Sequence, residues 1–183
     1  MVKTKKTRIE IEFRSRFAKE KYTKLKRFLD KKAELLGPDD KDVYFFTFPD
    51  KLLKVVDNVS KDNAKIVLKM NRIGNGSNFE EFEIPISRHD VKKTVKVFKL
   101  LGFTKLMMTP QKRINYLYKG VELALKYSTV WGYHLELEVL IKNIKQKATV
   151  ELKIRAVADE LEVKLMSEEE LKNFVDSIDR ERK

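Results

Sequence analysis

Apolar and charged side chains alternate along two segments that lie far apart in the chain. In segment 8–16, Ile9, Ile11 and Phe13 occupy one set of alternate positions, and the charged residues, among them Glu10 and Glu12, occupy the other. Because successive side chains of a strand point to opposite faces, this pattern predicts a strand with one apolar and one charged face. Segment 133–139 repeats the pattern. Each of the two predicted strands therefore carries a Glu-x-Glu pair on a single face.

The rest of the hydrophobic pattern predicts helices separated by groups of strands. Apolar residues at helical spacing indicate a helix over 17–36 that Gly37 and Pro38 end, and further helices over 91–101, 150–161 and 167–178. Runs typical of strands lie at 43–48, 52–56, 64–70, 79–86, 111–118, 121–128 and 133–141. The turn residues 74–77 predict a hairpin. This order indicates an α+β fold with antiparallel strands.

Composition narrows the class of protein. The chain has 183 residues, of which 42% are hydrophobic and 37% charged, so we expect one soluble globular domain over residues 1–183. Its formal net charge of +12 favours an anionic partner, such as nucleic acid, an anionic membrane surface or a small polyphosphate. The chain lacks cysteine, which excludes disulfides and thiolate metal sites. No apolar stretch is long enough to span a bilayer, and we expect the cytoplasm as the location.

Several predicted strands carry charges on one face. The Glu-x-Glu pairs are joined by cations on other strands, namely Lys54, Lys69 and Arg113. For one strand, the simplest interpretation is a solvated outer face, because antiparallel sheets commonly have one apolar and one wet face. For several strands together, a barrel of about eight strands would instead enclose the charges. We expect a closed or nearly closed antiparallel eight-stranded barrel over about 8–141, with helices outside it, including those over about 145–180.

A tunnel that contains both carboxylates and cations has a chemical use. Mg²⁺ and Mn²⁺ prefer oxygen ligands, and clustered carboxylates repel one another without such an ion. Lysine and arginine would bind the oxygens of a phosphate group. The charge pattern therefore indicates a site for a divalent metal together with a phosphorylated ligand.

An ordered set of motifs resembles the CYTH family, the triphosphate tunnel metalloenzymes that include class IV adenylate cyclases and thiamine triphosphatases. The matching residues are Glu10-Ile-Glu12-Phe-Arg14, Asp42-Val-Tyr44-Phe45 with Pro49, Lys69, Arg113 ahead of Tyr116, and Trp131-Gly132-Tyr-His-Leu-Glu136-Leu-Glu138. The likeness runs from about residue 8 to residue 141.

This resemblance implies roles for individual residues. Glu10, Glu12, Glu136 and Glu138 would surround Mg²⁺ or Mn²⁺, and Arg14, Lys54, Lys69 and Arg113 would bind phosphate. Glu10, Glu12 and Arg113 are the implied catalytic residues. The implied ligand is a triphosphate such as ATP, thiamine triphosphate or tripolyphosphate. Either water attacks the terminal phosphorus or, in a cyclase, the ribose hydroxyl attacks the α phosphorus. Family members are often dimers, so a homodimer is a further expectation.

Three residues depart from the family pattern and leave other functions open. Val56 replaces a frequent arginine, Lys126 replaces an aspartate, and Gln111 replaces a cation. A polyphosphate-binding module without catalysis is therefore one alternative. Binding of nucleic acid through the lysine-rich first helix is the second. The histidine at 134 shares the face of the second Glu-x-Glu pair, and Tyr116 and Tyr118 are expected outside the barrel under a helix.

Overall fold

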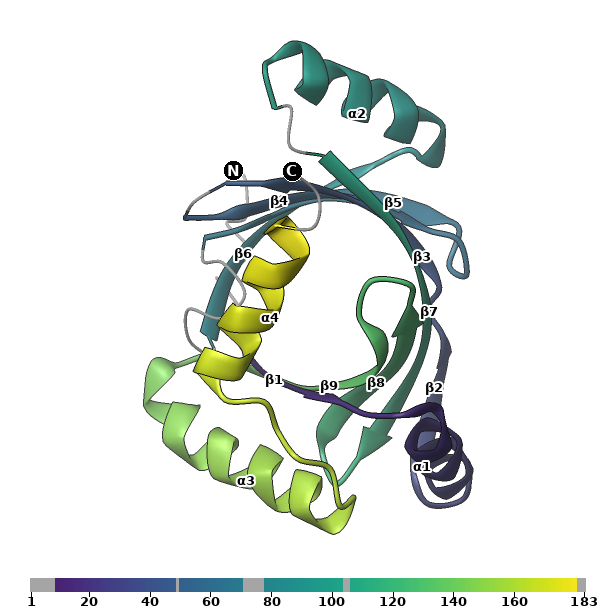
Figure 1. Cartoon of the computed structure of the whole chain (residues 1–183), viewed down its shortest axis with the longest axis vertical. Coiled ribbons are helices and arrows are strands. Elements are labelled where there is room, and N and C mark those ends of the chain that lie inside the picture. The colour runs from purple at the N-terminus through teal and green to yellow at the C-terminus, as the bar shows by residue number, and fades with distance from the viewer. Residues whose placement is uncertain (1–8, 49, 71–77, 104–105, 181–183) are drawn as a thin grey trace, which may run out of the picture.

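The computed structural model describes residues 9–48, 50–70, 78–103 and 106–180. Its main element is one antiparallel sheet of nine described strands, arranged in the order β2-β7-β3-β4-β5-β6-β1-β9-β8 (Figure 1). The strands are β1 (Ile9–Arg16), β2 (Glu34–Pro38), β3 (Lys41–Thr47), β4 (Leu52–Asn58), β5 (Asn63–Lys69), β6 (Asn78–Ile86), β7 (Leu106–Tyr118), β8 (Val121–Ser128) and β9 (Gly132–Ile141). The expected strands are all present, and the turn 74–77 and Pro49 lie outside the described residues.

The sheet curls because its longest strand, β7, pairs with a different strand along each of its two halves. The first half of β7 pairs with β3 from Leu106 to Gln111, and its second half pairs with β8 from Lys112 to Tyr118. Figure 1 shows the strands following a ring as a result. We call the inner surface of this ring the concave face.

The wall of the ring is incomplete beside β1. This strand pairs with β9 along its whole length but with β6 only over Ile9 to Ile11. Farther along, the backbone oxygen of Arg14 accepts a hydrogen bond of 2.8 Å from the backbone nitrogen of Met166 instead. The α+β class and the curled antiparallel sheet are confirmed. Closure into an eight-stranded barrel is corrected to a curled sheet of nine described strands that is open along part of its wall.

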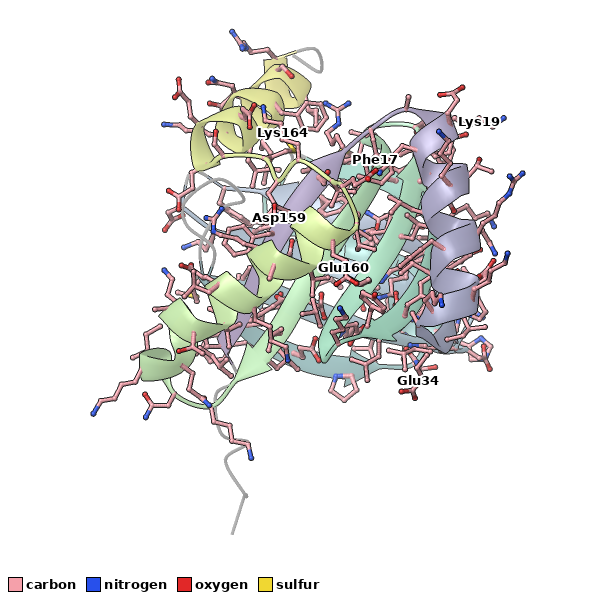
Figure 2. All side chains as sticks on the ribbon, turned by 90° about the horizontal axis from the view of Figure 1, so that it is seen from below. Phe17, Lys19, Glu34, Asp159, Glu160 and Lys164 are labelled. Atoms are coloured by element: carbon pink, nitrogen blue, oxygen red, sulfur yellow. The ribbon has the colours of Figure 1, made fainter. Side chains whose placement is uncertain are left out.

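Four α-helices accompany the sheet in the described part of the chain: α1 (Lys19–Lys32), α2 (Val91–Leu100), α3 (Lys147–Glu160) and α4 (Glu168–Arg180). Two 3₁₀ turns, η1 (Arg88–Asp90) and η2 (Ile144–Gln146), precede α2 and α3. Helices α1 and α3 flank the same outer part of the sheet, as Figure 2 shows, while α2 covers β3 to β5. None of the described helices combines the length and the apolar character that a membrane span requires.

The first helix is shorter than its apolar pattern predicted. It ends at Lys32, and residues 34–38 form β2, which pairs with the second half of β7. That half of β7 extends beyond its pairing with β3, so its backbone groups on this side are available to another strand. Leu36, which helical spacing had placed on the apolar side of this helix, is exposed on β2. The prediction of a helix over 17–36 was therefore wrong at its C-terminal end.

The apolar sets of the alternating strands lie outside, under the helices. Leu135 and Leu137 of β9 and Ile11 of β1 are fully buried in one cluster with residues of α1 and α3. Tyr116 and Tyr118 belong to this cluster, as expected, and each hydroxyl lies 2.8 Å from a carboxylate on the covering helix, Asp30 of α1 or Glu160 of α3. Because side chains alternate, the charged sets of the same strands lie on the concave face.

Candidate metal and phosphate site

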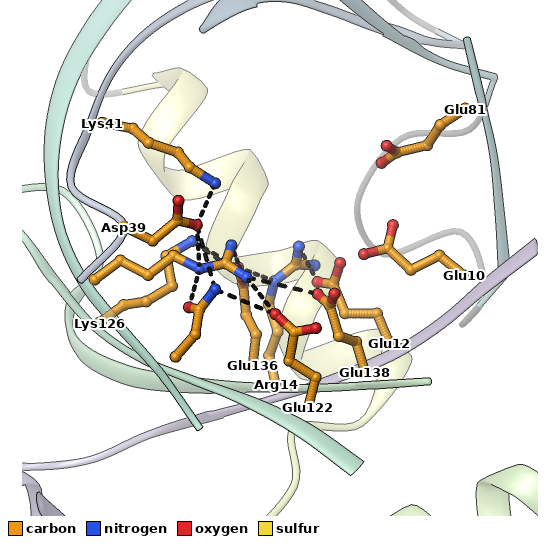
Figure 3. A network of polar contacts seen from close by, with 12 residues as sticks. Glu10, Glu12, Arg14, Asp39, Lys41, Glu81, Glu122, Lys126, Glu136 and Glu138 are labelled. Atoms are coloured by element: carbon orange, nitrogen blue, oxygen red, sulfur yellow. Dashed lines mark hydrogen bonds and ion pairs between the residues drawn. The ribbon is translucent and has the colours of Figure 1, made fainter. Parts of the chain in front are cut away.

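Three carboxylates meet on the concave face where β1 pairs with β9. Glu12 lies directly opposite Glu138 in the register, and Glu10 is two residues away on β1. One oxygen from each of Glu10, Glu12 and Glu138 lies within 4.8 Å of the others. Figure 3 shows the three side chains pointing toward one another. We call this group the acidic trio.

Three carboxylates lie close together in the trio, and the cations near them only partly offset burial and mutual repulsion. Burial, and then the nearby Glu10 carboxylate, raise the pKa of Glu138 to about 9. Burial also raises the pKa of Glu12, although Arg14 and Lys69 oppose this effect. Three oxygen ligands with a shared excess of negative charge form a donor set that suits a hard divalent cation. The residues present therefore fit a metal such as Mg²⁺ or Mn²⁺.

Lys69 contacts two of the three carboxylates of the trio. Its ammonium lies 2.9 Å from Glu10, 3.5 Å from Glu12 and 2.5 Å from Glu81 of β6. These carboxylates hold the pKa of Lys69 above its usual value despite burial. Lys69 thus reaches the acidic trio from β5, which only β6 separates from β1 in the sheet.

Glu136 has different surroundings, although it lies on the same face of β9. Its carboxylate accepts hydrogen bonds from Lys126 Nζ, at 3.0 Å to each oxygen, and from Arg14 Nε at 3.2 Å. Arg113 Nη1 lies 3.7 Å away. Burial favours the neutral acid, but these three cations hold the pKa of Glu136 well below its usual value. Glu136 is therefore a buried anion surrounded by positive charge.

Arg113 is held in place by residues that the sequence pattern did not single out. Asp39 accepts from the amide of Asn115 and lies 3.3 Å from Arg113 Nε, which donates to Asn115 Oδ1 at 2.6 Å. The backbone nitrogen of Arg113 donates to Asp40 Oδ1 at 2.9 Å. Asp39 also contacts Lys41, whose ammonium is 2.6 Å away. Burial opposes ionisation of Asp39, yet Lys41 and its other partners hold its pKa below the usual value.

Lys54 differs from the other cations of the concave face. It is half-buried on β4, and within the described residues its ammonium makes no hydrogen bond or ion pair. Burial, and then the repulsion of Lys69, lower its pKa to about 8. An ammonium in this position is available to a ligand.

The predicted site residues thus occupy one face, in two groups. Glu10, Glu12 and Glu138 form the acidic trio, while Glu136 lies with Arg14, Lys126 and Arg113, as Figure 3 shows. Glu136 lies outside the acidic trio, and the roles assigned to the individual residues remain predictions. Val56 lies in a small buried apolar cluster with Val43, Val67 and Phe45.

Aromatic residues pack where the turn between β8 and β9 contacts α4. The Trp131 ring lies 4.9 Å from Phe174 of α4 and 5.3 Å from His134, and the Arg16 guanidinium lies 3.7 Å above Phe174. His134 Nδ1 is 3.0 Å from the Gly132 carbonyl oxygen. Burial lowers the pKa of His134 to about 3, so its ring is neutral at physiological pH. His134 therefore packs against Trp131 and lies outside the acidic trio.

Comparison with known proteins agrees with this geometry. The CYTH domain family matches residues 8–171. Among solved structures, a protein from Pyrococcus horikoshii shares 27% sequence identity, with a TM-score of 0.68, over 85% of this chain and 91% of that one. A conserved hypothetical protein from Pyrococcus furiosus shares 26% identity over the same fractions, with a TM-score of 0.69.

A more distant match in structure is to a protein whose activity is described. A protein from Hippeastrum, described as a candidate adenylyl cyclase with a dominant triphosphatase activity, shares 15% identity. The match covers 86% of this chain and 89% of that one, with a TM-score of 0.60, and shows a common fold. No curated protein matches the chain.

Proposed function

The chain belongs to the CYTH domain family, and from this premise we propose that it is a metal-dependent enzyme that hydrolyses a triphosphate. The observation that carries the proposal is the acidic trio, in which three carboxylate oxygens lie within 4.8 Å of one another on a face that also carries buried cations. Negative and positive groups on one enclosed face match a metal bound together with a polyphosphate.

Glu10, Glu12 and Glu138 would hold the metal, which we propose is Mg²⁺ or Mn²⁺. When bound, such an ion would polarise a phosphoryl oxygen and neutralise charge. The side chains of this chain would bind the phosphates. Lys54 is available to bind a phosphate oxygen, and Arg14, Lys69 and Arg113 would surround the other phosphates. Because their partners are carboxylates of the same face, these cations are positioned before the ligand arrives.

Two considerations favour hydrolysis over cyclisation of ATP. The Hippeastrum protein of similar fold is described as mainly a triphosphatase. A cyclase must also orient a ribose hydroxyl against the α phosphorus, whereas a triphosphatase needs only the phosphates and water.

The test is a panel of substrates. Purified protein is mixed with Mg²⁺ or Mn²⁺ and with ATP, thiamine triphosphate or tripolyphosphate, and both phosphate release and cyclic AMP are measured. We expect metal-dependent phosphate release from at least one substrate, and a loss of about 100-fold or more in Glu10→Gln. The matched control is Glu160→Gln, because Glu160 lies on α3 outside the ring and contacts Tyr118. No product from any substrate would refute the enzymatic proposal.

A polyphosphate-binding module without turnover is the second candidate. The observation that favours it is the contact of the Lys126 ammonium with both oxygens of Glu136. Three carboxylates, those of the trio, then remain to bind metal. This candidate predicts tight binding of tripolyphosphate, measured by calorimetry, with no phosphate released from it. Turnover in the panel above excludes it.

A further inference from the structure

The two acidic residues of β9 face opposite charge environments, and Lys126 is the main cause. Its ammonium lies 3.0 Å from both oxygens of Glu136, so it spans the edge of the carboxylate at which a metal would bind. Both side chains are buried, with exposed fractions of 6% for Lys126 and 7% for Glu136. The contact is therefore a buried ion pair. A solvated surface pair at the same distance would contribute little energy.

Glu136 contacts three cations, two of which also lie near other carboxylates. One carboxylate contacts the three cations Lys126, Arg14 and Arg113, of which Arg14 also contacts Glu12 and Arg113 also lies 3.9 Å from Glu138. A divalent ion placed at Glu136 would have to displace an ammonium from 3.0 Å and remain beside two guanidinium groups. Like charges at such separations in a buried place repel strongly.

We propose that Lys126 is an internal counter-cation that confines the divalent metal to a single site at Glu10, Glu12 and Glu138, and that keeps Glu136 as the anchor of a phosphate-binding group. That group consists of Lys126, Arg14 and Arg113. This inference rests on the proposed function, since it assumes that the trio binds metal. It divides the face into a metal end and a phosphate end that meet along β9.

The cations of this group are held in fixed positions by carboxylates of the concave face. Arg14 donates Nε to Glu136 and contacts Glu12 through Nη2, while Arg113 lies 3.7 Å from Glu136 and 3.9 Å from Glu138. Each guanidinium has five N–H donors, so a phosphate oxygen can be bound beside these contacts. Glu136 therefore determines where these cations stand without itself touching the metal.

The experiment counts bound metal without any substrate. Apoprotein is titrated with Mn²⁺ alone, and free Mn²⁺ is measured by electron paramagnetic resonance. We expect one tight Mn²⁺ per chain in the wild type and in Lys126→Arg, which keeps the charge. Lys126→Asp replaces the cation with a ligand beside Glu136, and we expect it to bind a second Mn²⁺. Glu136→Gln should keep one Mn²⁺, whereas Glu138→Gln should weaken that site at least tenfold.

The outcomes separate this inference from the proposed function. Two tight Mn²⁺ ions in the wild type, or loss of the single one in Glu136→Gln, overturn the role of Lys126 but leave a metal enzyme standing. A second ion absent from folded Lys126→Asp also overturns that role. If Lys126→Asp fails to fold by circular dichroism, the wild-type count and Glu136→Gln decide. No Mn²⁺ bound by the wild type overturns both proposals.

Discussion

Glu136 and Glu138 lie two residues apart on one face of β9, yet the surroundings of their carboxylates are opposite. Glu138 lies with Glu10 and Glu12, and burial together with Glu10 raises its pKa to about 9. Glu136 contacts Lys126, Arg14 and Arg113, which hold its pKa well below the usual value. The same residue type on the same strand thus lies once among carboxylates that raise its pKa and once among three cations that lower it. Strand alternation determines the face of a side chain, but its neighbours on adjacent strands determine its chemistry.

The largest effect expected from this comparison is on the stability of the apoprotein. Glu136→Ala leaves three buried cations without their shared carboxylate, so we expect the free energy of unfolding to fall by about 3 to 5 kcal/mol. Glu138→Gln removes a carboxyl group whose raised pKa makes the chain take up a proton on folding at neutral pH, so it should leave that free energy unchanged or raise it. Urea unfolding at neutral pH with a chelator present measures both. A larger loss for Glu138→Gln than for Glu136→Ala would reverse the comparison.

Metal removal gives the next largest effect. A ligand that binds only the folded state at about 100 times its Kd stabilises it by about 2.7 kcal/mol. Saturating Mn²⁺ should therefore raise the thermal midpoint of the wild type, and a chelator should cancel this increase. Glu138→Gln should lose most of the increase, while Glu160→Gln on the outer side should keep it. An equal increase in Glu138→Gln and the wild type would argue that Mn²⁺ binds elsewhere.

A smaller effect is expected at the phosphate end. Asp39→Asn removes the charge that faces Arg113 Nε at 3.3 Å and Lys41 at 2.6 Å. Because charge-assisted contacts fix the position of these cations, we expect KM for a triphosphate to rise about tenfold with a smaller change in kcat. Steady-state kinetics measure the two constants separately. Asp42→Asn is the matched control, since Asp42 alternates to the other face of β3. An unchanged KM in Asp39→Asn would show that Arg113 needs no such support.

The smallest effect concerns pH. Burial lowers the pKa of Lys54 to about 8, so its ammonium loses its proton as the pH rises through about 8. Tripolyphosphate affinity without metal should then fall severalfold between pH 7 and pH 9. Lys54→Met should weaken binding at pH 7 and flatten part of this dependence, because Lys41, whose pKa burial also lowers to about 8, titrates in the same range. Calorimetry at the two pH values tests this, and an affinity that rises with pH would contradict it.

The same titration has an opposite effect on stability. Between about pH 8 and the usual pKa of lysine near 10.4, the unfolded chain binds more protons at position 54 than the folded one. The contribution of Lys54 to the free energy of unfolding therefore increases as the pH rises through this range. Ligand affinity and apoprotein stability should change in opposite directions, which a comparison of binding and urea unfolding can detect.

Much of this arrangement was predictable because it depends on alternation alone. Once the strands formed, alternation placed both carboxylates of each Glu-x-Glu pair on one face of the sheet. It likewise placed Tyr116 and Tyr118 of β7 together on the opposite face. Strand β2 was missed because Leu36 continues the helical spacing of α1. The edge of β7 with which β2 pairs is known only from the three-dimensional structure.

The division of the four predicted metal ligands could not be predicted in the same way. It depends on the contact between Lys126 of β8 and Glu136 of β9. The sequence showed that Lys126 departs from the family pattern, but not which carboxylate it contacts. Asp39 follows Gly37 and Pro38 in an irregular segment between β2 and β3, where no period marks a functional side chain. Its role follows from hydrogen bonds to residues more than seventy positions away.

The most direct test of the account is a crystal structure with Mn²⁺ and tripolyphosphate, in which anomalous scattering locates the metal. The account predicts manganese bound by Glu10, Glu12 and Glu138, phosphate oxygens at Lys54 and Arg113, and Glu136 still in contact with Lys126. Manganese on Glu136, or an acidic trio that contacts no metal in such crystals, would contradict it.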